Sequence, residues 1–228
     1  MNTAASDVDV LILSSATLGD GPDLTRLLKT SYQSNSDFTV RDEAYFQDHF
    51  SGRSVVLTAR SEGQLIGTMS ASLISCSADL GYEDEGMLTT ALVPALYLSR
   101  AATVSGGRTS GINSLMRLYC IEAALELGLQ SIVGFVYQEA SRTRLMAALG
   151  YSFSPLSSGS NSVREYHSQC LFATLLLKTA GKFALDSLRD QCSQSGKNVK
   201  WQSIPLADAL IADRSQDKPI PQIEALTR

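Results

Sequence analysis

The chain has 228 residues, of which 44% are hydrophobic, so it is long enough and apolar enough to bury one sizeable core. Its formal net charge is −4, and no block of Lys or Arg interrupts the sequence. A nucleic-acid-binding protein depends on a clustered basic surface, so this charge balance argues against a nucleic-acid partner.

The amino-terminal third is expected to hold two helices and a hairpin. Gly21-Pro22-Asp23 opens a helical pattern, and the Asp23 carboxylate suits the unpaired N–H groups there, either as the N-terminal cap or in the first turn. Farther on, Ser61-Glu62-Gly63 separates two β-type runs, and a Gly-containing turn of three residues in that place predicts a hairpin. The elements predicted here are strands at 9–13, 54–60 and 64–75, a helix opening at 21–23, a helix at 41–50 and an acidic loop at 76–90.

The segment 96–151 alternates strands and helices and is the most informative part of the chain. An apolar strand at 96–104 leads through a polar, Gly-rich turn into a long helix at 111–127. The charges of this helix are confined to Arg117, Glu122 and Glu126, so most of its circumference should be covered. A buried strand at 131–137 and a short helix that stops at Gly150 follow.

The turn from Ser105 to Asn113 lies between the carboxyl end of a strand and the amino end of a helix. Backbone N–H groups at such a helix end lack internal partners and attract anions. Arg108 adds a permanent positive charge, and Gly111 has no Cβ to keep a phosphate at a distance. We therefore predict an anion site here, although the same glycines also suit a plain tight turn.

The carboxyl-terminal part begins with two more predicted strands, 151–155 and 163–177, joined by a Ser/Gly loop. An amphipathic helix at 179–193 and a polar tail follow. We therefore divide the chain into a main α/β domain at 1–178 and a helical and polar extension at 179–228.

No metal or membrane association is expected from the sequence. The four cysteines are far apart and form no CxxC pair, which favours free thiols over a zinc site. The start of the chain lacks the charged and apolar regions of a secretory signal, and the apolar run 171–177 is too short to span a bilayer. These features predict a cytoplasmic protein without a membrane span.

The order of elements and the central residues resemble the GNAT acyltransferase superfamily. The family's phosphate turn, an Arg or Gln followed by Gly three residues later, is similar to Arg108-Thr109-Ser110-Gly111. Ser99-Arg100 stands at the family's spacing upstream, and Leu149-Gly150-Tyr151 is similar to the end of the family's last central helix. The resemblance implies an α/β (α+β) fold: a mixed, mostly antiparallel sheet with helices on both faces, in the order β-α-α-β-β-β-α-β-α-β-β.

The resemblance also implies an enzyme that transfers an acyl group from a pantetheine thioester to an amine. No cofactor is then bound permanently, because acyl-coenzyme A or acyl carrier protein acts as a co-substrate. The residues implied to hold the donor are Val104, Ser105, Arg108, Thr109, Ser110, Gly111, Ile112 and Asn113.

Three departures from the family pattern bear on the donor. Met146 stands where many family members have a tyrosine that serves as general acid. Glu139 stands in place of the Asn that often begins that helix, and Asn113 stands in place of the last small residue of the turn. These departures, with the long carboxyl-terminal part, favour the long-chain N-acyl amino acid synthase branch, which takes acyl chains from acyl carrier protein. An ordinary acetyl-coenzyme A enzyme and a non-catalytic pantetheine-binding module remain alternatives.

Candidate catalytic and substrate-binding residues follow from the reaction. Attack by an amine needs a proton acceptor, and departure of a thiolate needs a donor. Glu139 is the first candidate base, although a carboxylate there also suits a helix end. The catalytic candidates are Glu139, Tyr137 and Glu165, and the substrate-binding candidates are Arg100, Tyr97 and His167. The acyl length, the acceptor and the oligomeric state stay open.

Overall fold

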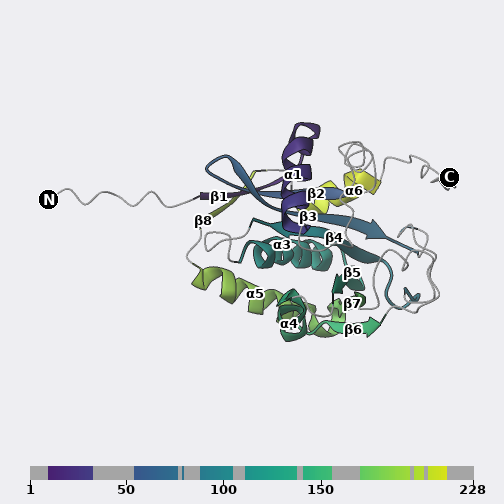
Figure 1. Ribbon diagram of the computed structural model, residues 1–228. Helices are drawn as coiled ribbons and strands as arrows, with labels where there is room; N and C mark the ends of the chain where they lie inside the picture. The colour runs from purple at the N-terminus through teal and green to yellow at the C-terminus, as the bar shows by residue number, and fades with distance from the viewer. Residues whose placement is uncertain are drawn as a thin grey trace.

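The computed structural model describes residues 10–32, 54–76, 79, 88–104, 111–137, 141–155, 170–195, 198–202 and 205–214. Within these residues, eight strands form one sheet in the order β6-β7-β5-β4-β3-β2-β1-β8 (Figure 1). Neighbouring strands pair antiparallel except β4 with β5 and β1 with β8. The strands are β1 (Val10–Ser15), β2 (Val55–Ser61), β3 (Gln64–Ile74), β4 (Ala95–Thr103), β5 (Ser131–Tyr137), β6 (Ser152–Pro155), β7 (Cys170–Leu176) and β8 (Asn198–Trp201).

Helices cover both faces of this sheet. The long helix α3 packs on the main apolar cluster, and α5 and α6 contact it there. Helix α1 contacts β3 and β4, and its buried leucines, Leu24, Leu27 and Leu28, are not part of that cluster. Figure 1 shows α1 on one side of the sheet and α3, α4 and α5 on the other. The helices are α1 (Gly21–Tyr32), α3 (Ile112–Glu126), α4 (Ser141–Ala148), α5 (Lys182–Gln194) and α6 (Leu206–Arg214), with short turns at Leu18–Asp20 and Leu177–Gly181.

The central elements agree closely with the sequence. The predicted strand 131–137 has the bounds of β5, and the strand and helix on either side of the predicted anion turn differ from β4 and α3 by one residue at each end. The hairpin is confirmed, but its turn has two residues rather than three, because Ser61 already pairs with Gln64. Glu62 and Gly63 both have positive φ, 51° and 77°, as a two-residue turn matching the strand twist requires.

Two predicted elements fall partly or wholly outside the described residues. The helix predicted at 41–50 lies outside them, and of the strand predicted at 163–177 only the part from Cys170 is described. The first helix begins at Gly21, so Asp23 is a first-turn residue, which is one of the two positions predicted for it, and its carboxylate pairs with Arg26 at 2.6 Å.

The carboxyl-terminal segment supplies elements that the predicted order lacks. Strand β8 pairs parallel with β1, from Val10 with Asn198 to Leu13 with Trp201. Trp201 stacks on Tyr119 of α3, with ring centroids 5.4 Å apart and an interplanar angle of 23°. Residues beyond 178 therefore extend the same sheet and cover α3. The division into two domains at residue 178 stays a prediction.

Candidate functional site

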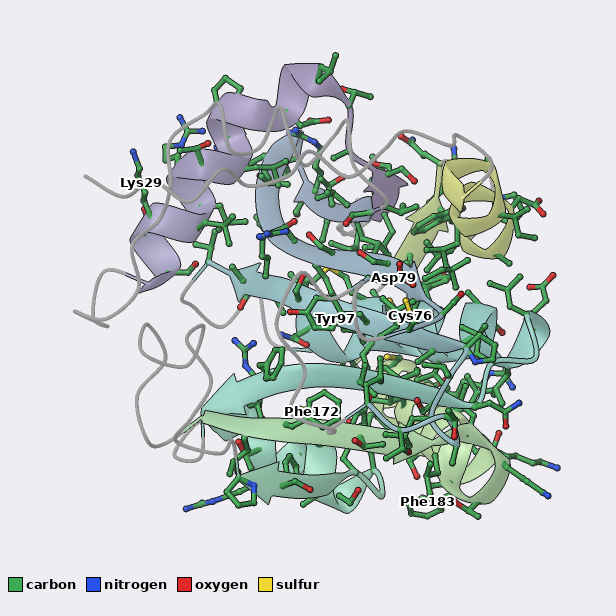
Figure 2. The ribbon with its side chains drawn as sticks, turned by 90° about the vertical axis from the view of Figure 1, so that its right-hand side faces the viewer. Lys29, Cys76, Asp79, Tyr97, Phe172 and Phe183 are labelled. Carbon is green, nitrogen blue, oxygen red and sulfur yellow. The ribbon has the colours of Figure 1, made fainter. Side chains whose placement is uncertain are left out.

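The main opening in the sheet is the separation of β4 from β5. The two strands pair in parallel from Ala95 with Ser131 to Leu98 with Gly134. Beyond that pair, β4 continues along β3 to Thr103, whereas β5 continues along β7 to Tyr137. We call residues 99–103 of β4 and 135–137 of β5 the fork. In the fork, β4 and β5 no longer pair with each other, and Figure 2 shows the two strands separating toward their carboxyl ends.

A close backbone contact sets the last pair before the fork. A Cβ added to Gly134 would lie 2.6 Å from the carbonyl oxygen of Leu98, a distance that real side chains do not adopt. Only glycine therefore allows β5 to approach β4 this closely. The vertex of the fork depends on one residue type at one position.

A β-bulge in β4 begins just beyond this vertex. Thr68 of β3 pairs with Ala102 and Ser70 pairs with Ser99, so Met69 stands opposite two residues, Arg100 and Ala101. Arg100 has a φ of 50°, which is uncommon for a residue with a side chain. Bulges bend a strand and redirect its side chains, and they often lie beside functional sites. The bulge therefore turns β4 away at the point where its pairing with β5 has ended.

Helix α3 begins beside the outer end of the fork. Gly111 precedes it with a φ of 83°, and no atom lies within 4 Å of a Cβ built there. The side chain of Ile112 is fully buried against Gly67 of β3, where an added Cβ would lie 2.7 Å from the Ile112 Cγ2 atom. Ile112 can therefore contact a ligand only through its backbone. Asn113 is partly exposed and Val104 is 40% exposed.

The first turns of α3 run level with the fork. Ile112 lies over Gly67, and the Cys120 Sγ atom lies 3.9 Å from the Met69 Sδ atom. Residues 67–69 of β3 stand opposite residues 100–103 of β4, which lie beyond the last β4–β5 pair. Residues 112–120 of α3 therefore pack beside the fork rather than beside the part of the sheet where β4 and β5 pair.

A buried arginine lies in this stretch of α3. Arg117 is 4% exposed, and its Nη1 atom is 3.0 Å from the hydroxyl of Tyr151, whose ring centroid is 5.4 Å from the guanidinium carbon. Its Nε atom is buried without a hydrogen-bond partner, and no carboxylate of the described residues pairs with it. A cation out of water with no counter-ion is costly, so this position is maintained against an electrostatic penalty.

Burial controls proton affinity around Arg117. Burial raises the pKa of the Cys120 thiol to about 12, although the nearby Arg117 charge opposes the rise. Burial also raises the pKa of Tyr151, again against the charge and the hydrogen bond of Arg117. Both groups are therefore neutral at physiological pH.

Arg117, Glu122 and Glu126 are the three charged residues of α3, and Arg117 is buried whereas Glu122 and Glu126 are not. Glu122 is on the surface, where its Oε1 atom is 2.6 Å from the Arg189 Nη2 atom. Arg117 precedes Glu122 by five residues, which is about 140° around a helix, whereas Glu126 follows Glu122 by about one turn. This angular offset is the signal in the sequence that would have placed Arg117 away from the charged stripe.

Helix α4 reaches across to β4. Arg142 lies in its first turn, and the Arg142 Nη2 atom donates to the carbonyl oxygen of Ala101 at 3.2 Å. Met146, on the same helix, is 4% exposed and belongs to the main apolar cluster. Met146 stands where the family resemblance places a tyrosine that acts as general acid. Its side chain is a buried thioether, which has no proton to donate.

Tyr97 lies in the closed half of the strand pair, opposite Val133. Its ring meets Phe135 edge-on, with centroids 6.1 Å apart, and Phe135 lies 5.5 Å from Phe172 of β7. This contact gives Tyr97 a structural role in the part of the sheet where β4 and β5 still pair. Figure 2 shows Tyr97 and Phe172 on neighbouring parts of the sheet. Its role in binding substrate stays a prediction.

Several candidate residues lie outside the described part of the chain. They include the donor-binding residues Ser105, Arg108, Thr109 and Ser110, the catalytic candidates Glu139 and Glu165, and the substrate-binding candidate His167. Tyr137 is the last residue of β5, and only its backbone is described. The structure thus brings Arg100, Val104 and Gly111 to the fork and the helix beside it, and it leaves the catalytic assignments as predictions.

Within the described ranges, no three His, Cys, Asp or Glu side chains gather closely enough to hold a metal ion. In the same part of the chain, no helix combines the length and the apolar character needed to cross a membrane.

Comparisons with known proteins identify the fold. No family model and no curated protein matches the sequence. Among solved structures, the ribosomal-protein-alanine N-acetyltransferase of Brucella melitensis is 20% identical, with a TM-score of 0.54 over 72% of this chain and 99% of that protein. An N-acetyltransferase of Staphylococcus aureus Mu50 is 12% identical, with a TM-score of 0.53 over 73% of this chain and 98% of its own.

A third similar structure is the PaiA N-acetyltransferase of Thermoplasma acidophilum, solved in complex with coenzyme A. It is 10% identical, with a TM-score of 0.51 over 73% of this chain and 98% of its own. At these identities the likeness shows the fold alone, which is the GNAT-like, mostly antiparallel α/β sheet that the sequence predicts. The three proteins are matched over nearly their whole lengths, and the remainder of this chain has no counterpart in them.

Substituting Gly134 tests the vertex of the fork. Gly134→Ala should lower the free energy of unfolding by about 1–3 kcal/mol, because the new methyl group would force β5 away from Leu98. Gly21→Ala is the matched control, since the added methyl meets no atom within 4 Å and Gly21 has helical φ and ψ. Urea unfolding measures both. Equal midpoints for Gly134→Ala and the wild type would show that the close approach does not constrain the strands.

Removing the Tyr151 hydroxyl tests the buried arginine. Tyr151→Phe should cost about 1.5–3 kcal/mol of stability, because Arg117 loses the one hydrogen bond it makes among the described residues. Tyr119→Phe is the control, since it keeps the ring on Trp201 and removes a hydroxyl with no hydrogen bond in the same part of the chain. Thermal unfolding at neutral pH compares the two variants. A larger loss for Tyr119→Phe would contradict the assignment.

Proposed function

We propose that this chain is an N-acyltransferase that moves an acyl group from a pantetheine thioester to the amine of a small molecule. The observation that carries the proposal is the fork, in which β4 keeps its pairing with β3 and loses β5 after Leu98. Where two neighbouring strands part in this way, an extended ligand can run between them and bind the peptide groups of the strand that it follows. A pantetheine arm, which is a chain with two amide groups, is a ligand of that shape.

The donor's anionic end would lie at the amino terminus of α3. The cap of that helix is the left-handed Gly111, which belongs to the predicted turn, and the first N–H groups of a helix have no partners within it. Partial positive charge at this end stabilises a phosphate. Arg108, Thr109 and Ser110 are proposed to complete the phosphate site, with the backbone of Ile112 and Asn113.

The reaction proceeds by attack of the neutral amine nitrogen on the thioester carbon. A tetrahedral intermediate forms, and its oxyanion is stabilised by backbone N–H groups of β4 near the bulge at Arg100. The intermediate then collapses with cleavage of the C–S bond, the amide is released, and the thiolate takes a proton. Holding amine and thioester together supplies much of the rate, so no metal is required.

Glu139 is the proposed base that accepts the amine proton, because it stands two residues after the end of β5 in the sequence. Tyr137 is the proposed donor to the thiolate, since Met146 is a buried thioether that cannot serve. Glu165 is the second candidate base. Arg100, His167 and Tyr97 are proposed to bind the acceptor, which would carry a carboxylate, as an amino acid does.

Two donors fit the proposal. Coenzyme A is supported by the similar Thermoplasma acidophilum structure, which was solved with that molecule. Acyl carrier protein is the second candidate, because Asn113 stands where the family turn has a small residue, and a carrier protein delivers one phosphate in place of a pyrophosphate. The long-chain N-acyl amino acid synthase branch would use the carrier protein.

Release of free thiol tests the function. Purified protein is mixed with acetyl- or long-chain acyl-coenzyme A, or with acylated carrier protein, and a set of amino acids. We expect thiol release that depends on the amine. Glu139→Gln should lower kcat by about 10²–10⁴-fold, because the amine loses its proton acceptor. Glu126→Gln, on an exposed position of α3, is the matched control and should leave kcat unchanged.

Each other outcome of this assay has a definite meaning. If coenzyme A binds and no pairing of thioester and amine releases thiol, the chain is a binding module and the proposed activity is wrong. If thiol release is intact in Glu139→Gln, the activity stands and Glu139 is not the base.

A further inference from the structure

Arg117 is a buried cation outside the groups that the proposed reaction uses. Its side chain is 4% exposed, its Nη1 atom donates to the Tyr151 hydroxyl at 3.0 Å, and its Nε atom is buried without a hydrogen-bond partner. Buried polar groups are normally satisfied, so each exception calls for an explanation. Apolar replacements of buried charges are often neutral or stabilising, so the stability of the fold does not by itself explain an arginine here.

The route of its side chain places the Arg117 charge over the middle of the sheet. Helix α3 contacts mainly β3 and β4, and the side chain runs from α3 to Tyr151, the residue before β6. In the sheet order β6-β7-β5-β4, the strands β4 and β6 are three strand spacings apart, which is about 14 Å. The two side chains therefore meet over the strands between, on the face that α3 and α4 cover (Figure 1).

Along the strand direction, the backbone of Arg117 is level with the fork. The neighbouring Met116 would lie 3.5 Å from a Cβ built on Gly67, and the Cys120 Sγ atom, almost one turn later, is 3.9 Å from the Met69 Sδ atom. That part of β3 stands opposite the β4 side of the fork. The Arg117 side chain therefore starts beside the place where β4 and β5 have parted.

Tyr151 approaches from the other side of the vertex. The next residue, Ser152, pairs with Thr174 of β7, and Thr174 pairs with Val133 of β5. Val133 is one residue short of the vertex, in the part of the sheet where β4 and β5 still pair. The hydrogen bond between Arg117 and Tyr151 therefore forms between these two levels, close to the vertex.

No described group balances the Arg117 charge. Burial raises the pKa of Cys120 to about 12 and also raises the pKa of Tyr151, so both stay neutral below about pH 9. The charged residues of α4, which covers the same face, are Arg142 and Arg144, and both are cations. Within the described ranges, no carboxylate pairs with Arg117. Its field therefore acts through protein, where it is screened less than in water.

We propose that Arg117 stabilises, by its charge, the negative charge that the acyl-transfer reaction creates in the fork. This inference rests on the proposed function. Attack of the amine moves an electron pair onto the thioester oxygen. Collapse of the intermediate re-forms the C=O bond and breaks the C–S bond, whose electron pair stays on sulfur until the thiolate takes a proton. A nearby cation favours both the oxyanion and the thiolate, and this role needs no contact with the substrate.

Two probes that differ only at sulfur test this inference: coenzyme A, and desulfo-coenzyme A, in which a hydrogen atom replaces the thiol. Titration calorimetry of the full chain between about pH 6 and pH 9 gives the Kd of each. The preference of the wild type for coenzyme A should increase with pH, because the thiolate forms and the cation stabilises it. In Arg117→Met, the preference at high pH should fall about tenfold, and the Kd of desulfo-coenzyme A should stay within about twofold.

The thiol-release assay provides a second measurement. Arg117→Met should lower kcat about tenfold, because the charge acts on anionic species that form during the reaction. KM should stay within about twofold, since the thioester that binds has no charge at the reacting atoms.

Two variants serve as controls. Tyr151→Phe breaks the same hydrogen bond as Arg117→Met but keeps the guanidinium, so it should keep the wild-type preference for coenzyme A. Arg189→Met removes a positive charge from the surface, where Arg189 pairs with Glu122 and water screens it, so it should match the wild type. Circular dichroism and thermal unfolding confirm that each variant is folded.

The outcomes separate this inference from the function beneath it. If Arg117→Met and the wild type show the same preference at every pH, Arg117 is a core residue only, and the inference is wrong. It is also wrong if Tyr151→Phe loses as much of the preference as Arg117→Met, because the hydrogen bond rather than the charge would then matter. If the folded wild type binds neither probe, the proposed function itself fails, and the inference fails with it.

Discussion

The close contact between Leu98 and Gly134 is the constraint on which the rest of the site depends. Because glycine has no Cβ, β5 can approach the β4 backbone at this pair, and the two strands part immediately beyond it. The bulge at Arg100 bends β4, and the fit of Ile112 over Gly67 fixes the start of α3 beside the open half. Two glycines and one bulge thus convert a continuous sheet into a strand edge that faces a helix terminus.

Three arginines of the described residues come from the elements that border this edge, although the whole protein has a net charge of −4. Arg100 comes from β4, Arg117 from α3 and Arg142 from α4. Arg117 is buried at the level of the fork without a carboxylate partner among those residues, and Arg142 contacts a neutral carbonyl. Such a field favours a ligand or an intermediate that carries negative charge. A pantetheine phosphate and a thioester oxyanion both meet that description.

The sequence predicted the parts of the fold that depend on local pattern. The continuous apolar run of β5 and the Gly-containing turn of the hairpin both have short-range signals, and both were found. The bulge at Arg100, the pairing of β8 with β1 and the Arg117–Tyr151 contact join residues far apart in the chain, so their patterns carry no local signal. For the site, the sequence indicated the turn and the strand beside it, but a linear pattern cannot show that β4 and β5 separate or that Arg142 reaches across.

A crystal structure of the protein with coenzyme A or a non-hydrolysable acyl thioether of it tests the central claim most directly. The account predicts a pantetheine arm in the fork, hydrogen-bonded along residues 99–103 of β4, with its phosphates at the amino terminus of α3. A ligand bound elsewhere on the protein would contradict it.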